Sequence, residues 1–269
     1  MAPLARADLE SLLHARKLDR TLTTALAPLD PYDEYAVAPA GVAALDGSLG
    51  GGLPRGQLSE LIGPRSSGRT SLLLQILAAA TGRGELVALV DALDAFDVES
   101  ASAARIELDR LLWVRGHVVA NPGMCRDLNQ RAVEQAIKAL TLVLQAGNFG
   151  LVVLDVAEAP REAIRHLPFT TWLRLQRMVE GTQTVCVLVG TEPMARSSAG
   201  LTLRLRTGGA GAAGQGGNSS SPSRPVGRFS GRLFEGLDVT AAVARARTHV
   251  REETTAMFTT AAFNDDASS

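Results

Sequence analysis

Lysine is almost missing from this 269-residue chain, which contains only Lys17 and Lys138. The other basic side chains are arginines, so a phosphate contact has to be made by a planar guanidinium rather than by a compact ammonium group. The formal net charge is −1. A chain with charges this balanced has no overall electrostatic signature of nucleic-acid binding.

Cysteine and histidine are scarce as well. The two cysteines, Cys125 and Cys186, lack the spacing of a metal site, and the four histidines are scattered, so a metal site is not expected. Cys186 lies inside an apolar run, as expected for a buried free thiol in a reducing compartment. No apolar run reaches the ~18 residues of a membrane span, and no signal peptide is recognised. The sequence therefore predicts a cytoplasmic protein without a membrane partner.

A glycine-rich loop is the most informative feature that is present. Residues 63–71 read Gly-Pro-Arg-Ser-Ser-Gly-Arg-Thr-Ser, which follows the phosphate-loop (P-loop) pattern except that Arg69 stands at the lysine position. An apolar strand precedes the loop and an apolar helix follows it, which is the setting that a P-loop requires. The predicted nucleotide-binding residues are Gly63, Ser66, Ser67, Gly68, Arg69, Thr70 and Ser71.

Short apolar strands and helices alternate from Leu58 to about Gly200. This alternation predicts an α/β fold with a mainly parallel sheet flanked by helices. Ligands of such sheets bind at the carboxyl ends of the strands. The residues expected at that edge are Gly63, Asp91, Asp155 and Thr191.

The sequence changes character after Gly200. Residues 207–223 are almost entirely Gly, Ala, Ser and Asn and predict a flexible loop. Antiparallel strands are predicted around it, with Val239 to His249 as an edge strand, and residues 264–269 are predicted to be disordered. Eight arginines oppose two acids within residues 201–251. We therefore expect DNA contact, if there is any, at Arg204, Arg206, Arg224 and Arg228; a solubilising face is the alternative.

The predicted organisation has four parts. Residues 1–40 form an N-terminal helix and linker, residues 41–200 the core, residues 201–263 the C-terminal strands, and residues 264–269 the tail. The N-terminal helix carries leucines at helical spacing, among them Leu12 and Leu13, and either folds back on its own domain or docks on a partner.

The run from Leu45 to Thr70 resembles the bacterial recombinase RecA. The resemblance rests on a leucine–aspartate lead-in, then Gly-Gly-Leu-Pro-Arg-Gly before the first strand, then the loop itself. It implies a RecA-like fold, binding of ATP and Mg²⁺, and a Walker B role for Asp155 near the metal. In that family the loop that corresponds to residues 207–223 faces the DNA axis.

Three positions depart from what the resemblance implies. Arg69 replaces lysine, Leu93 stands where RecA-like enzymes place a water-activating glutamate, and Thr191 stands in place of a nucleotide-sensing glutamine. Leucine can neither accept a proton nor orient water. We therefore expect no catalytic residue and at most a weak ATPase, and we leave open whether ATP and Mg²⁺ bind.

A RecA-like core with an altered site, together with the segment from Trp172 to Arg177, resembles the ImuA family, which is similar in part to SulA. This resemblance implies a DNA-damage-induced (SOS) accessory protein of mutagenic translesion synthesis. Its implied partners are an ImuB-like polymerase subunit, an error-prone replicative-type polymerase, RecA, and single-stranded DNA. Trp172 is a candidate partner contact, although an ordinary amphipathic helix explains the segment equally well.

Three functions follow from these observations. The first is a protein-binding adaptor with a degenerate ATPase site. The second is an ATP-dependent, DNA-binding recombinase paralogue, and the third, more distant, is a SulA-like inhibitor of cell division. The missing glutamate at Leu93 favours the adaptor, since loss of a positioned general base costs ~10²–10⁴ in rate.

Overall fold

The computed structural model describes residues 36–116, 126–207, 236–247 and 254–261. Their centre is an 8-stranded sheet in the order β10-β9-β8-β3-β7-β6-β4-β5. Its strands are β3 (Leu58–Ile62), β4 (Val87–Asp91), β5 (Leu111–Arg115), β6 (Leu151–Asp155), β7 (Val185–Gly190), β8 (Ala199–Thr207), β9 (Gly236–Ala246) and β10 (Thr255–Ala261).

The sheet is parallel from β8 to β5, and antiparallel where β9 pairs with β8 and β10 pairs with β9. This confirms the predicted α/β fold with a mainly parallel sheet and C-terminal antiparallel strands. The expectation that Val239 to His249 forms an edge strand was wrong. β9 lies between β8 and β10, and the edges are β10 and β5.

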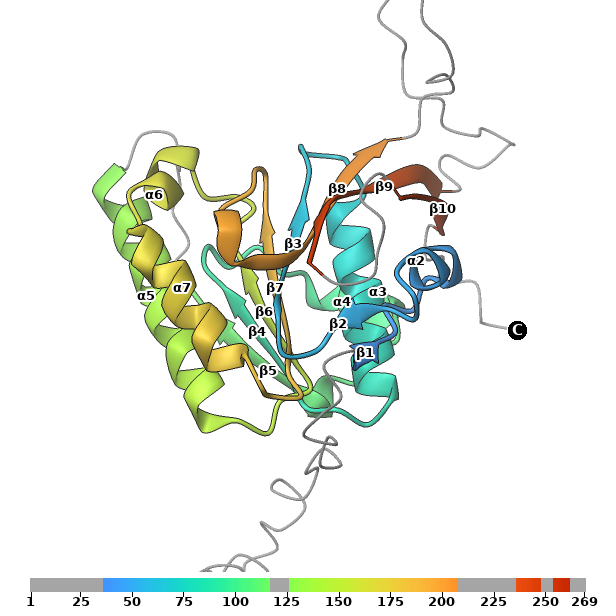
Figure 1. Cartoon of the computed structure of the whole chain (residues 1–269), viewed down its shortest axis with the longest axis horizontal. Helices are drawn as coiled ribbons and strands as arrows, with labels where there is room; N and C mark the ends of the chain where they lie inside the picture. Colours follow the sequence, from blue (N-terminus) through green and yellow to red (C-terminus); the bar gives the residue numbers. More distant parts are fainter. Residues whose placement is uncertain (1–35, 117–125, 208–235, 248–253, 262–269) are drawn as a thin grey trace, which may run out of the picture.

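Helices cover both faces of the parallel part of the sheet. Figure 1 shows α5 and α7 on one face and α3 on the other. The strands β3, β4, β6 and β7 are buried almost throughout, because each is covered on both sides. The helices are α2 (Ala43–Ser48), α3 (Arg69–Gly82), α4 (Val98–Ala103), α5 (Arg126–Ala146), α6 (Arg161–Arg165) and α7 (Phe169–Val179), with 3₁₀ turns η2 (Leu108–Arg110) and η3 (Arg196–Ser198).

The leucine–aspartate lead-in has a structural role. Leu45 is buried in the core, and the Asp46 carboxylate accepts the backbone N–H groups of Ala40 at 2.6 Å and Gly41 at 3.2 Å. Gly52, at φ 139°, lies so close to the Ala38 carbonyl that a side chain has no room. These contacts hold β1 (Val37–Ala38) against β2 (Leu53–Pro54), so the lead-in fixes how the chain enters the sheet.

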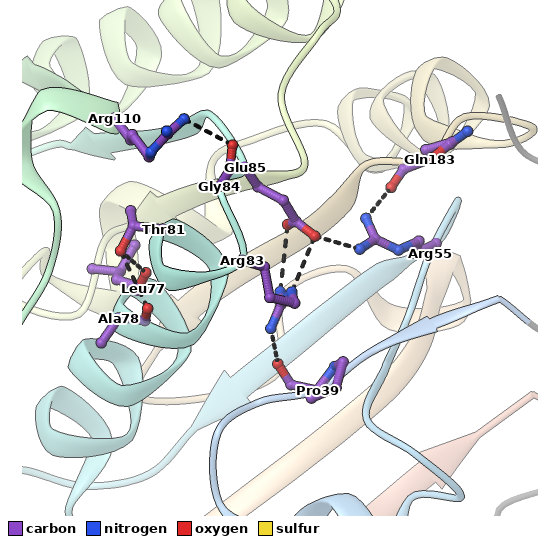
Figure 2. A network of polar contacts seen from close by, with 10 residues as sticks. All are labelled: Pro39, Arg55, Leu77, Ala78, Thr81, Arg83, Gly84, Glu85, Arg110 and Gln183. Carbon is purple, nitrogen blue, oxygen red and sulfur yellow. Dashed lines mark hydrogen bonds and ion pairs between the residues drawn. The ribbon is translucent and has the colours of Figure 1, made fainter. Parts of the chain in front are cut away.

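A polar network closes the amino ends of the parallel strands, and Figure 2 shows its members. The buried Glu85 carboxylate pairs with Arg55 at 2.6 Å and with Arg83 at 3.1 Å. Arg55 also donates to the carbonyl of Gln183 at 2.7 Å, and Arg83 donates to that of Pro39 at 2.8 Å. Four chain segments that lie far apart in the sequence are thereby held together at the end of the sheet away from the P-loop.

Candidate functional site

The P-loop lies where the sequence predicts it, between β3 and α3. Two of its residues have left-handed backbone angles, Ser66 at φ 60° and Gly68 at φ 83°. A Cβ on Gly63 would lie 2.8 Å from the carbonyl oxygen of Leu205, and a Cβ on Gly68 would overlap Val239. Both glycines are therefore required, and the loop delivers the chain to the N-terminus of α3, where free N–H groups favour an anion.

The predicted nucleotide-binding residues of the loop differ in access. Ser66 and Thr70 are exposed and Ser71 is half-buried, so their polar groups face the surface. Ser67 and Arg69 are buried, and among the described residues the Ser67 hydroxyl has no hydrogen-bond partner. The loop thus presents its apex to solvent and keeps its most distinctive cation inside.

Arg69 is directed into the protein. Its side chain is 6% exposed. Its guanidinium donates hydrogen bonds to the carbonyls of Gly63, just after β3, and of Gly190, at the end of β7, the latter at 3.1 Å. Burial lowers the pKa of this guanidinium, while the nearby Asp155 and Glu158 carboxylates oppose that change. An arginine still carries its charge under such conditions, so a buried cation links the two strand ends.

Glu158 is the residue of the site that sequence reasoning missed. Its carboxylate accepts a hydrogen bond from Arg65 at 2.7 Å and lies 3.9 Å from the guanidinium of Arg69. Its position three residues after the strand-terminal Asp155, at the carboxyl edge of the sheet, was the signal that could have identified it.

Two aspartates stand side by side at the carboxyl edge of the sheet, since Asp91 and Asp155 are directly paired in register. Burial, with a contribution from Asp91, raises the pKa of Asp155 to about 6, against the opposing hydrogen bond from the Ala157 N–H and the charge of Arg69. The Asp91 carboxylate accepts hydrogen bonds from the backbone N–H groups of Ala95 at 3.0 Å and Phe96 at 2.8 Å. Asp155 is therefore the more available oxygen ligand at this edge.

The position of the water-activating glutamate holds no base. Leu93 packs against the core on the α5 side of the sheet. The next residue, Asp94, is a carboxylate, but Arg115 binds both of its oxygens, at 2.8 and 2.7 Å. That hydrogen bonding lowers the pKa of Asp94, which makes it a weaker base.

The loop after β7 is fixed from within the sheet. Thr191, at the expected position of the sensing glutamine, is half-buried. The residues after it are held by the buried Glu60 of β3, which accepts the N–H groups of Met194 and Ala195, each at 2.7 Å, and the hydroxyl of Thr202 at 2.7 Å. This side chain joins the P-loop strand to the β7–β8 connection.

The site fits a polyphosphate with its backbone better than with its side chains. The glycine loop and the first turn of α3 supply N–H groups for phosphate, and Asp155 and Thr70 are the oxygens suited to Mg²⁺. Arg69, however, is engaged by two carbonyls. Within the described ranges no group of three His, Cys, Asp or Glu residues could hold a metal ion, so a bound Mg²⁺ would take its other ligands from phosphate and water.

The other predicted site residues are dispersed. Arg204 and Arg206 lie two residues apart on β8, which directs them to one face of the sheet, with Arg206 exposed. Trp172 on α7 is 3% exposed and belongs to the core cluster on the α5 and α7 side of the sheet, as an ordinary amphipathic helix would place it, and its role as a partner contact stays a prediction. Arg224, Arg228, Leu12, Leu13 and the loop residues 208–223 lie outside the described part of the chain.

Comparison with known proteins agrees with this geometry. The family model described as the RecA N-terminal domain matches residues 28–165. Protein RecA of Clavibacter michiganensis is 36% identical over 163 residues, which cover 54% of this chain and 41% of that protein. Protein RecA of Symbiobacterium thermophilum is 37% identical over 124 residues, which cover 46% and 31%. The chain thus spans less than half the length of these relatives.

The fold also matches a solved structure, the crystal structure of the RadB recombinase. The TM-score is 0.53 at 20% identity, over 83% of this chain and 96% of that one. At this identity the likeness shows the fold alone. Among the described residues no helix is long and apolar enough to cross a membrane.

Proposed function

Because the chain belongs to the family of the RecA N-terminal domain, we propose that it is a RecA-like accessory protein of SOS-induced mutagenic translesion DNA synthesis. In this role it is an adaptor that binds an ImuB-type polymerase subunit. The observation that carries the proposal is the position of Arg69, whose guanidinium bonds to the carbonyls of Gly63 and Gly190 rather than reaching out of the loop.

The chemistry of the surrounding site supports an adaptor over an enzyme. Hydrolysis needs a group that orients water, and the expected position is filled by Leu93, which is half-buried and packs against the core. Asp94 next to it is held by Arg115 through both oxygens. A fold that keeps its P-loop architecture without a base is suited to presenting surfaces to other proteins.

The proposed partners follow from the ImuA resemblance. They are the ImuB-like subunit, an error-prone replicative-type polymerase, and RecA, with single-stranded DNA as a further contact through arginines of β8. A cytoplasmic location is part of the same proposal. Binding of ATP with Mg²⁺ is part of the proposal only as a weak, non-hydrolytic interaction, with Thr70 and Asp155 near the metal.

An ATP-dependent recombinase paralogue is the second candidate. It is favoured by Gly63 and Gly68, which the tight packing of the loop requires, and by Asp155, which lies at the carboxyl edge beside Asp91. The two candidates differ in turnover. Enzymes typically turn over at ~1–10³ s⁻¹.

Hydrolysis and partner binding test the proposal together. We expect the purified protein, with single-stranded DNA and Mg²⁺, to hydrolyse ATP far below ~1 s⁻¹. We also expect the protein recovered from DNA-damaged cells to carry the ImuB-like subunit, identified by mass spectrometry. DNA-stimulated turnover that disappears in Arg69→Ala would establish the recombinase instead.

A matched variant tests the N-terminal leucines as the partner contact. Leu12 and Leu13 replaced together by aspartate should lose the co-purifying subunit while the melting temperature stays unchanged. A monomer that binds neither the ImuB-like subunit nor RecA, and whose double aspartate variant remains active in damage-induced mutagenesis, would end the adaptor proposal.

A further inference from the structure

The turn after β6 brings a carboxylate back over the P-loop. Asp155 accepts the N–H group of Ala157 at 2.9 Å, and Ala159 donates to the carbonyl of Val156 at 3.0 Å. These bonds close the chain tightly at the end of the strand. Glu158 projects from this turn toward the loop between β3 and α3.

Glu158 engages both arginines of the P-loop. One carboxylate oxygen accepts from Arg65 at 2.7 Å, and the other lies 3.9 Å from the guanidinium of Arg69. These are the side-chain cations that residues 63–71 could offer to a phosphate group. A carboxylate and a phosphate oxygen are recognised by the same guanidinium geometry, so the two compete for these donors.

We propose that Glu158 is a specificity-determining residue that occupies the anion position of the P-loop in cis and disfavours nucleoside triphosphates. It acts by holding the loop cations and by setting a negative charge beside the space that a polyphosphate would enter. This role of Glu158 rests on the proposed function, in which the P-loop does not serve hydrolysis.

Because the Arg65 and Glu158 side chains are at least partly exposed, the Glu158 carboxylate competes with a phosphate group for the arginines and does not block them permanently. The Arg65 side chain is 82% exposed and that of Glu158 is 36% exposed. Ion pairs in such positions are weak, and salt screens them. Removing the carboxylate should therefore raise triphosphate affinity measurably, and the gain should shrink as the ionic strength rises.

The test is a titration of fluorescently labelled ATP with Mg²⁺ at low ionic strength, with unlabelled inorganic triphosphate as a competitor. We expect Glu158→Gln to bind about fivefold more tightly than the wild type, which corresponds to about 1 kcal/mol. Glu107→Gln is the matched control, because Glu107 also pairs with an arginine, Arg110 at 2.8 Å, but lies before β5 at the opposite end of the sheet. It should bind like the wild type.

Two outcomes overturn the inference. One is an unchanged dissociation constant in Glu158→Gln, including the case in which neither protein binds at millimolar nucleotide. The other is an equal gain in Glu107→Gln, which would make the effect one of net charge alone. The shift in melting temperature with triphosphate provides a second readout, and Glu158→Ala a second variant.

The proposed function can fail separately. Co-purification with the polymerase subunit does not involve nucleotide affinity, so loss of that partner would refute the adaptor while leaving the Glu158 result intact. Conversely, an unchanged affinity in Glu158→Gln would leave the adaptor standing with a nucleotide site that is weak for another reason.

Discussion

At the residue scale, the buried carboxyl group of Glu60 fixes one side of the site. Each of its oxygens accepts at least one hydrogen bond, from two backbone N–H groups and from the hydroxyl of Thr202. Buried polar groups that lose their partners are costly, whereas a replacement that satisfies them can be nearly neutral. The side chain therefore acts as a connector between β3 and the loop after β7.

Substitutions at this position should separate shape from hydrogen bonding. Glu60→Ala leaves three buried donors without an acceptor, and we expect it to lower the free energy of unfolding by at least about 3 kcal/mol. Glu60→Gln retains one acceptor oxygen for the two N–H groups and offers its amide to Thr202, so it should cost less than about 1.5 kcal/mol. Urea denaturation at neutral pH measures both, and equal losses would contradict the role of the hydrogen bonds.

The raised pKa of Asp155 predicts that the stability of the protein depends on pH. Its pKa is about 6 in the folded protein, above the ordinary aspartate value of 3.8, so between these values the folded state binds more protons than the unfolded one. The free energy of unfolding therefore falls as the pH rises from about 4 to about 6. Above that pH, the loss of stability caused by the Asp155 charge stays constant.

Removing this charge should stabilise the protein at neutral pH. We expect Asp155→Asn to raise the free energy of unfolding by about 1–3 kcal/mol at a pH of about 7.5, since its side-chain oxygen can still accept the Ala157 N–H. Near a pH of about 4 the difference from the wild type should vanish. Denaturant titrations at the two pH values test this, and a pH-independent difference would exclude titration of Asp155 as the cause.

At the scale of elements, the antiparallel strands extend the sheet beyond the parallel core. β8 pairs in parallel with β3 and antiparallel with β9, so it is the strand where the two halves of the sheet meet. Its inward residues Leu203 and Leu205 pack in the core, and the alternation sends Arg204 and Arg206 to the other face. We propose this face as the contact for single-stranded DNA.

Replacing both arginines tests this surface. We expect Arg204→Ala with Arg206→Ala to weaken binding of single-stranded DNA and to flatten the log–log salt slope by about 0.7 for each phosphate that is no longer neutralised. The control is Arg174→Ala with Arg177→Ala, a pair of arginines on α7. Fluorescence anisotropy over a range of salt concentrations measures DNA binding by both variants. An unchanged salt slope in the β8 variant would show that DNA does not bind at this face.

At the scale of the whole molecule, hydrophobic alternation was sufficient to predict the α/β class with its mainly parallel sheet, and the glycine loop was sufficient to place the P-loop. Strands such as β6 and β7 are apolar because both of their faces are buried, so their runs are visible in the sequence. The position of β9 was not predictable in this way. Pairing partners of antiparallel strands are set by long-range register, which a pattern of period two does not encode.

The site was predictable to the level of its backbone. The spacing of glycines located the P-loop, and strand ends located Asp91 and Asp155. The direction of Arg69 was not predictable, because it depends on a carbonyl of Gly190, 121 residues away. The contact of Arg65 with Glu158 was hidden in the same way, since the two lie 93 residues apart, although the position of Glu158 just after a strand end marked it as a candidate.

The network around Glu85 has a consequence for how such a chain can evolve. The ion pairs of the buried Glu85 with Arg55 and Arg83 hold the strands at one end (Figure 2). Arg69 and Leu93, which differ from the enzyme pattern, follow the carboxyl ends of β3 and β4 at the other end. Mutations that abolish chemistry at one end therefore leave the anchoring contacts of the other untouched. Such a division allows the P-loop end to accept substitutions one at a time while the contacts at the other end keep the strands in place.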